Sequence, residues 1–251
     1  MKIIIRLLMT ILFVTLINDF GLGQMLNQEL KYAIEKISRH TIDDCYCKKE
    51  MDFLFKQPAD KMLPIYENLL YGKITQYNLT TWNENIEYAK RFYSGAAAKM
   101  LGKMKILEAL NIIRKWIDMQ IIPDASKKFE YGELIAVNSA IQAIGNYNQQ
   151  DDVLRLRKFI NHPDWGTRTS LTRALAKIGG KDSIELLHNM MLNDPNLTVR
   201  IKAISSLKDC GDESVLPDLE KVYEDKFYFS DSYGKKIIKD TIDAIKRRIT
   251  K

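Results

Sequence analysis

A short segment near the N-terminus of the 251-residue chain holds several residue types that could bind a metal ion. They are His40, Asp43, Asp44, Cys45 and Cys47. A structural zinc site takes four ligands, usually as two Cys or His pairs. The segment lacks a second pair, so oxidation or burial of its cysteines is the simpler interpretation. The sequence predicts no metal site and no cofactor.

The remaining histidines and the third cysteine do not form a recognisable catalytic motif. His162 and His188 have no serine or cysteine nucleophile in an evident motif, and Cys210 falls in an apolar position that predicts burial. The sequence also contains no glycine-rich phosphate loop, no HExxH and no paired-carboxylate signature. We therefore expect a protein without catalytic activity of its own.

Two arginines spaced 32 residues apart, Arg168 and Arg200, are candidates for binding an acidic partner. On successive helices they would form a basic ladder on the concave face of a repeat protein. The alternative is that each arginine bonds an acidic residue or carbonyl of the neighbouring turn. Asp164 and Asp194 are the local candidates, and this structural interpretation is favoured.

Aromatic residues between the predicted helices are the other candidates for partner binding. Trp165 falls in a turn where Leu197 holds the matching slot one repeat later, which favours packing over an exposed binding residue. A second cluster either caps the last repeat or forms a recognition surface. Its members are Phe227, Tyr228, Phe229 and Tyr233.

These residues belong to a repeating pattern of helix pairs. Residues 161–168 align with residues 193–200, and each copy precedes an apolar-periodic segment that ends at a glycine. Gly145, Gly179 and Gly211 are 34 and 32 residues apart, and we expect each to adopt the left-handed backbone that ends a helix. Such pairs bury their apolar stripes only by stacking on neighbours. The sequence predicts an all-α protein, an α-solenoid of helical hairpins.

The segments NDPNLTVRIKAISSL and LAKIGGKDSIELL resemble HEAT repeats of the short type found in phycobilisome-lyase-like proteins. The positions that match the family pattern are Asp194, Val199, Arg200, Ala203, Leu207, Gly211 and Asp212. Thr167 departs from it, because valine is usual there, and the unit that begins at Leu134 lacks the arginine. The resemblance implies an α-solenoid whose usual role is to bind other proteins. The alternative is a lyase-like or glycosylase-like enzyme built on the HEAT fold.

The regularity of the pattern divides the chain into three parts. Residues 1–23 form one, residues 24–125 form an irregular helical region of divergent repeats, and residues 126–251 carry the HEAT-like repeats and a C-terminal capping helix. The break near residue 125 contains Pro123 and leads into a predicted protruding loop at residues 127–132.

The first 23 residues have the composition of a cleaved secretory signal. Lys2 and Arg6 precede an apolar run at residues 7–17, and the small residues Gly21 and Gly23 follow. The run is shorter than the ~20 residues that a membrane span needs. We therefore expect an exported protein, periplasmic or extracellular, with no stable membrane span after cleavage.

The net charge of +6 does not by itself indicate a nucleic-acid partner. The cations are spread along the predicted helices and alternate with acidic residues, as in DDVLRLRK at 151–158. Solvated helix faces show this pattern. The expected partner is another protein, and no nucleic acid.

Overall fold

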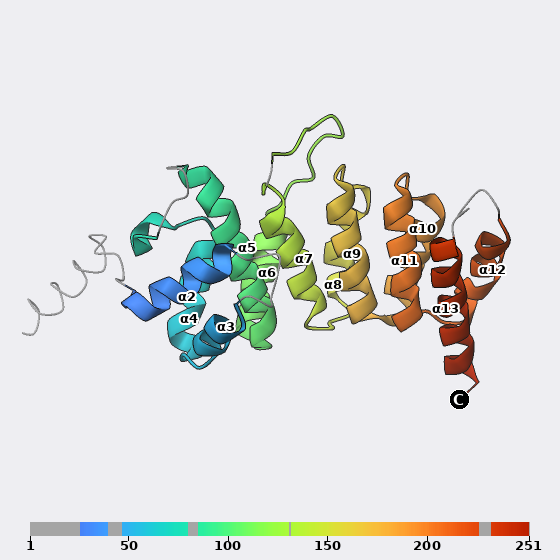
Figure 1. Cartoon of the computed structure of the whole chain (residues 1–251), viewed down its shortest axis with the longest axis horizontal. Helices are drawn as coiled ribbons and strands as arrows, with labels where there is room; N and C mark the ends of the chain where they lie inside the picture. Colours follow the sequence, from blue (N-terminus) through green and yellow to red (C-terminus); the bar gives the residue numbers. More distant parts are fainter. Residues whose placement is uncertain (1–25, 40–46, 80–84, 131, 226–231, 251) are drawn as a thin grey trace, which may run out of the picture.

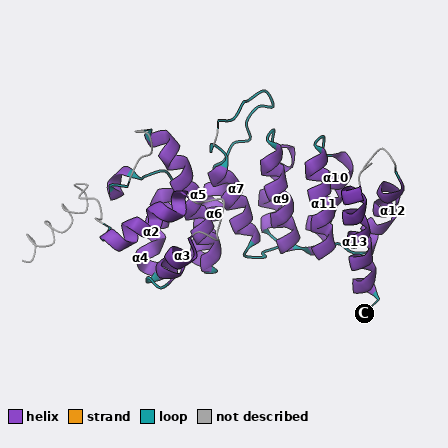
Figure 2. Ribbon diagram, in the orientation of Figure 1, coloured by secondary structure: helices purple, strands orange, loops and turns teal. Residues whose placement is uncertain are grey.

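The computed structural model describes residues 26–39, 47–79, 85–130, 132–225 and 232–250. These residues form helices joined by turns, without a strand, so the all-α prediction is confirmed (Figure 2). The helices are α2 (Gln28–Arg39), α3 (Lys48–Phe55), α4 (Ala59–Leu70), η2 (Thr75–Tyr77), α5 (Ile86–Met104), α6 (Leu107–Asp118), α7 (Ile135–Gly145), α8 (Asp152–Leu156), η4 (Arg157–Asn161), α9 (Trp165–Ile178), α10 (Gly180–Asn193), α11 (Leu197–Cys210), η5 (Glu213–Val215), α12 (Leu216–Glu224) and α13 (Ser232–Ile249).

The second half of the chain is a row of helical hairpins, which confirms the predicted solenoid. The first helices α7, α9, α11 and α13 stand side by side, and α5 extends the row toward the N-terminus (Figure 1). Each first helix packs directly on the next, while the second helices contact one another little. The first helices therefore form the more tightly packed row.

One hydrophobic core runs through the described part of the chain, from Leu30 in α2 to Ile245 in α13. It continues past residue 125, where the sequence predicts a change of region, because α5 and α6 both pack on α7. The helices before α5 are arranged differently, since α2 and α4 pack around α5 instead of extending the row (Figure 1).

Asx side chains begin two of the first helices, α9 and α11. Asp164 Oδ2 accepts a hydrogen bond from the Thr167 amide at 2.6 Å, and Asn196 Oδ1 accepts one from the Thr198 amide at 2.9 Å. These bonds satisfy amides that have no partner within the helix. The repeated Asn-x-Pro-Asx pattern in the sequence thus marks where α9 and α11 start.

The expected role of the three repeat glycines is wrong for two of them. Only Gly179 has a positive φ, of 68°, whereas Gly211 has φ −63° and Gly145 is the last residue of α7. At Gly145 the reason for glycine is close packing, because an added Cβ would lie 2.6 Å from the Cα of Ala174 in α9. Gly102 in α5 has the same role, with an added Cβ 2.7 Å from the Cα of Ala143 in α7.

The predicted protruding loop is present. The chain between α6 and α7 rises above the row of first helices (Figure 1). An ion pair of 2.7 Å between Arg91 and Glu130 and a stack of Phe129 on His162, with ring centroids 5.6 Å apart, are among the contacts that hold it. The loop is thus attached both to α5 and to the turn before α9.

Within the part of the chain that the structure describes, none of the helices has the length and apolar character of a membrane span. The predicted signal segment, residues 1–23, lies outside the described residues.

Candidate functional site

Arg168, the first predicted partner-binding arginine, is buried in an ion pair. Its Nε and Nη2 donate to the two carboxylate oxygens of Asp194 at 2.7 and 2.9 Å. Its Nη1 donates to the backbone carbonyl of His162 at 2.6 Å. The side chain therefore joins the turns before α9 and after α10. This confirms the favoured interpretation of the sequence, in which the arginine bonds a local acidic residue instead of a partner. Asp194 is that residue, whereas Asp164 caps α9.

Arg200 holds the equivalent position in α11 and is part-buried. Asp225 directly follows α12, as Asp194 follows α10. Because Arg168 is buried, the two arginines do not present a ladder on the surface.

The predicted packing of Trp165 is wrong. Its side chain is 50% exposed, and that of Leu197 in the matching slot is 43% exposed. Both are the first residue of a helix, and a helical side chain covers the turn that precedes it. At a first residue that turn does not exist, so the side chain projects into solvent. Tyr233, near the start of α13, is also exposed. Phe227, Tyr228 and Phe229 lie outside the described residues.

The cysteines that the structure describes are held by local contacts. Cys47 is buried, with its Sγ 3.6 Å from the Lys36 carbonyl. Cys210 is only part-buried, and the loss of solvent raises the pKa of its thiol to about 11. The described residues contain no group of three or more His, Cys, Asp or Glu that could hold a metal ion. His40, Asp43, Asp44 and Cys45 lie outside them.

His162 connects the protruding loop to the repeats. It is buried, stacks on Phe129, and its Nδ1 accepts a hydrogen bond from the Asp164 amide at 3.1 Å. Burial lowers the pKa of His162, and the positive charges of Arg168 and Lys127 lower it further, against the opposing effect of Asp164. The folded chain therefore holds this ring neutral.

The lowered pKa of His162 predicts that stability falls in mild acid. The unfolded chain binds the proton at the ordinary pKa of 6.5, whereas the folded chain binds it only at lower pH. The free energy of unfolding should thus decrease as the pH falls below 6.5 and level off below the folded pKa. Urea titrations between about pH 7.5 and 5 would measure this slope. A His162→Gln variant with an unchanged slope would contradict the assignment.

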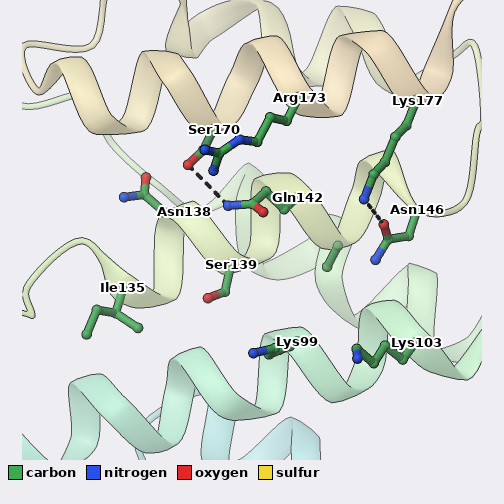
Figure 3. Close-up of a pocket in the computed structure, with 11 residues that line it drawn as sticks. Lys99, Lys103, Ile135, Asn138, Ser139, Gln142, Asn146, Ser170, Arg173 and Lys177 are labelled. Carbon is green, nitrogen blue, oxygen red and sulfur yellow. Dashed lines mark hydrogen bonds between the residues drawn. The ribbon is translucent and has the colours of Figure 1, made fainter. Parts of the chain in front are cut away.

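A groove that was not predicted from the sequence lies across the first helices α5, α7 and α9. It has a volume of about 550 Å³ (Figure 3). The residues that line it are Lys99, Lys103, Ile135, Asn138, Ser139, Gln142, Ala143, Asn146, Ser170, Arg173 and Lys177. Four of these side chains are cations, and none of the described residues in the lining is acidic.

The cations of the groove raise the local positive potential. Burial lowers the pKa of Lys177, and the positive charges of Lys105, Arg173 and Lys103 lower it further. Like charges this close repel one another, and a bound anion would relieve the repulsion. The groove is therefore suited to a negatively charged ligand.

Uncharged polar side chains of α7 lie between the cations. Gln142 donates to Ser170 Oγ at 3.3 Å, and Asn146 Oδ1 accepts from Lys177 Nζ at 2.6 Å (Figure 3). The Oδ1 atom of Asn138 is buried and has no hydrogen-bond partner among the described residues. Amide groups both donate and accept hydrogen bonds, so this row can bind peptide groups or hydroxyls.

The sequence did contain a signal for the groove. Lys99 and Lys103 are four residues apart on one predicted first helix, and Arg173 and Lys177 are four apart on another. Residues four apart share a helix face, and like charges there are unfavourable without a compensating partner. What the sequence did not show is that the two pairs flank the same face of α7, one pair on each side of it.

Comparison with known proteins bears on the repeats and not on the groove. A family model described as HEAT repeats matches residues 138–208 and 156–229. No curated protein shows a significant match to the chain.

Proposed function

Because the chain is a HEAT-repeat protein over residues 138–229, we propose that it is an exported, non-catalytic interaction module that binds an acidic segment of another protein. HEAT repeats generally mediate protein binding, and stacked repeats offer the long surfaces that this requires. Export is supported by the composition of residues 1–23.

The observation that carries the proposal is the charge of the groove across α5, α7 and α9. Lys99 and Lys103 line one side of it and Arg173 and Lys177 the other (Figure 3). Complementary charge speeds the encounter of two proteins and selects the partner. Scattered surface lysines would not concentrate cations from helices far apart in the sequence on both sides of one amide-lined groove.

The alternative of a lyase-like or glycosylase-like enzyme draws no support from the groove. Its lining offers amide, hydroxyl and cationic groups. General acid–base catalysis most often uses His or a carboxyl group, and less often Lys. The described residues in the lining include neither His nor a carboxyl group, and Lys177, whose pKa is lowered, is hydrogen-bonded to Asn146.

Reversing the charge on one side of the groove should abolish partner capture. The full chain is immobilised and exposed to medium or envelope extract, and an Arg173→Glu/Lys177→Glu variant is compared with wild type. We expect at least about a tenfold loss of the captured acidic protein, because charged contacts each contribute roughly 1.5–3 kcal/mol.

The matched control reverses the same number of positive charges, but on the row of second helices. Lys115 in α6 and Lys181 in α10 are exposed, and a Lys115→Glu/Lys181→Glu variant should capture the partner as wild type does. Circular dichroism would confirm that both variants fold. Equal losses in the two variants would show that net charge, and not the groove, governs binding, and the proposal would fail.

A further inference from the structure

The geometry points to a binding mode in which the acidic segment lies as an extended strand along α7, with its backbone on the amide row and its side chains toward α5 and α9. This inference rests on the proposed function and specifies the conformation of the ligand.

Three rows of polar side chains run in the same direction along the groove. Figure 3 shows α5, α7 and α9 one beside the other, with residue numbers that increase from the same end. Four-residue steps separate the members of the amide row on α7 and of each cation pair. The rows are Lys99 and Lys103 on α5, Asn138 and Gln142 on α7 with Asn146 directly after its last residue, and Arg173 and Lys177 on α9.

The repeat of these rows matches the repeat of an extended peptide. Four residues of an α-helix rise about 6 Å. Two residues of an extended strand rise about 6.6–6.8 Å. Since a strand repeats its orientation every second residue, every second peptide unit would meet one amide of α7. The row from Asn138 to Asn146 is about 12 Å long, which is enough for roughly five extended residues.

The orientation of a strand also suits the charges on both sides. Successive side chains of a strand point to opposite sides, and the backbone N–H and C=O groups lie perpendicular to them. A strand whose backbone faces α7 therefore directs alternate side chains toward α5 and toward α9. Consecutive acidic residues would then reach cations on both sides of the groove.

Two of the three amides in the row, those of Asn138 and Gln142, have unused hydrogen-bonding capacity. The amide of Asn146 already bonds groups of both neighbouring helices. Asn138 Oδ1 is buried without a partner among the described residues, which is costly for an acceptor. Gln142 donates only one long bond, of 3.3 Å, to Ser170. A peptide unit offers one donor and one acceptor, and a side-chain amide can pair with both. Rotation of Asn138 into the groove would satisfy its oxygen with a ligand N–H.

A peptide fits the lining better than a single-stranded nucleic acid. Proteins that bind single strands stack bases on aromatic side chains, and this contributes about 1–3 kcal/mol for each base. The described lining contains no aromatic residue, and Ile135 is its only large apolar side chain. The groove therefore recognises charge and backbone amides.

The test compares peptides of equal charge with and without backbone donors. Fluorescence anisotropy measures the binding of the full chain to a fluorescein-labelled hexaglutamate, to the same peptide N-methylated at every residue, and to an oligothymidylate of equal charge. We expect the N-methylated peptide and the oligothymidylate to bind at least about tenfold more weakly than hexaglutamate, since each lost hydrogen bond costs roughly 1 kcal/mol.

Variants of the protein test whether the loss of peptide binding comes from the amides of α7. An Asn138→Ala/Gln142→Ala variant should bind hexaglutamate about tenfold more weakly and the N-methylated peptide as wild type does. The control is Asn111→Ala/Asn189→Ala, which removes exposed amides from α6 and α10 and should bind as wild type does.

Each of the other possible outcomes contradicts either the strand geometry of the ligand or the proposed protein partner. If the N-methylated peptide binds as tightly as hexaglutamate, the strand geometry is wrong, although an acidic partner in the groove remains supported by the charge-reversal experiment. If hexaglutamate does not bind at all, the strand inference fails in the same way. If the oligothymidylate binds more tightly, both the inference and the proposed protein partner are wrong.

Discussion

Replacing Arg168 with alanine is expected to destabilise the fold by about 3–5 kcal/mol, the cost of breaking a buried ion pair. The side chains of Arg168 and Asp194 are 8% and 3% exposed. Removing the guanidinium leaves the Asp194 carboxylate away from water, and within the described part of the chain the Asn196 amide alone then bonds it, at 2.8 Å. Thermal unfolding should show a decrease of roughly 6–20 °C in Tm.

Two further variants separate the ion pair from other effects. Arg173→Ala, on the same helix but exposed, should change stability by less than about 0.5 kcal/mol. Adding Asp194→Asn to Arg168→Ala removes the buried charge and should recover part of the loss. Equal destabilisation by Arg168→Ala and Arg173→Ala would show that the Arg168–Asp194 pair is not buried in solution.

Replacing Gly145 with leucine is expected to cost about 2–3 kcal/mol, because the added side chain overlaps the backbone of α9. Even a Cβ would lie 2.6 Å from the Cα of Ala174 and 3.1 Å from its carbonyl oxygen. The only response is a wider spacing between α7 and α9. Urea unfolding of the variant would measure the loss of stability.

The same variant should also change the groove. Gln142 and Ser170 face each other across α7 and α9, 3.3 Å apart, and a wider spacing separates them. Binding of hexaglutamate should weaken together with stability. Ser205→Leu, which places the same side chain at an exposed position of α11, is the control and should leave both unchanged. If Gly145→Leu is as stable as wild type, close packing is not what requires the glycine.

The fold was largely predictable because a recurring sequence pattern shows where each repeat begins. The phrase at residues 161–168 recurs at 193–200, and both copies begin first helices with an Asx cap. Apolar periodicity then identifies the buried faces, as in Leu171, Leu175 and Ile178. Each helical hairpin packs mainly on the hairpins next to it in sequence, so local pattern and tertiary packing agree.

The candidate site was less predictable because it combines residues from distant parts of the chain. Lys99 and Lys177 are separated by more than two helical hairpins in sequence and line one groove in the structure. Arg168 has the residue type of a partner-binding side chain, but the approach of Asp194 places it inside the fold. Residue type alone could not distinguish it from Arg173, which is exposed one and a half turns further along α9.

The sequence by itself determined the helical repeats, their caps and the protruding loop, since these depend on periodicity, Asx residues and proline over short distances. Only the tertiary structure decided which polar side chains are buried and which face a common groove. Burial and proximity depend on how closely neighbouring helices approach, as Gly102 and Gly145 allow α5, α7 and α9 to do. That spacing places the cation pairs on both sides of the amide row of α7.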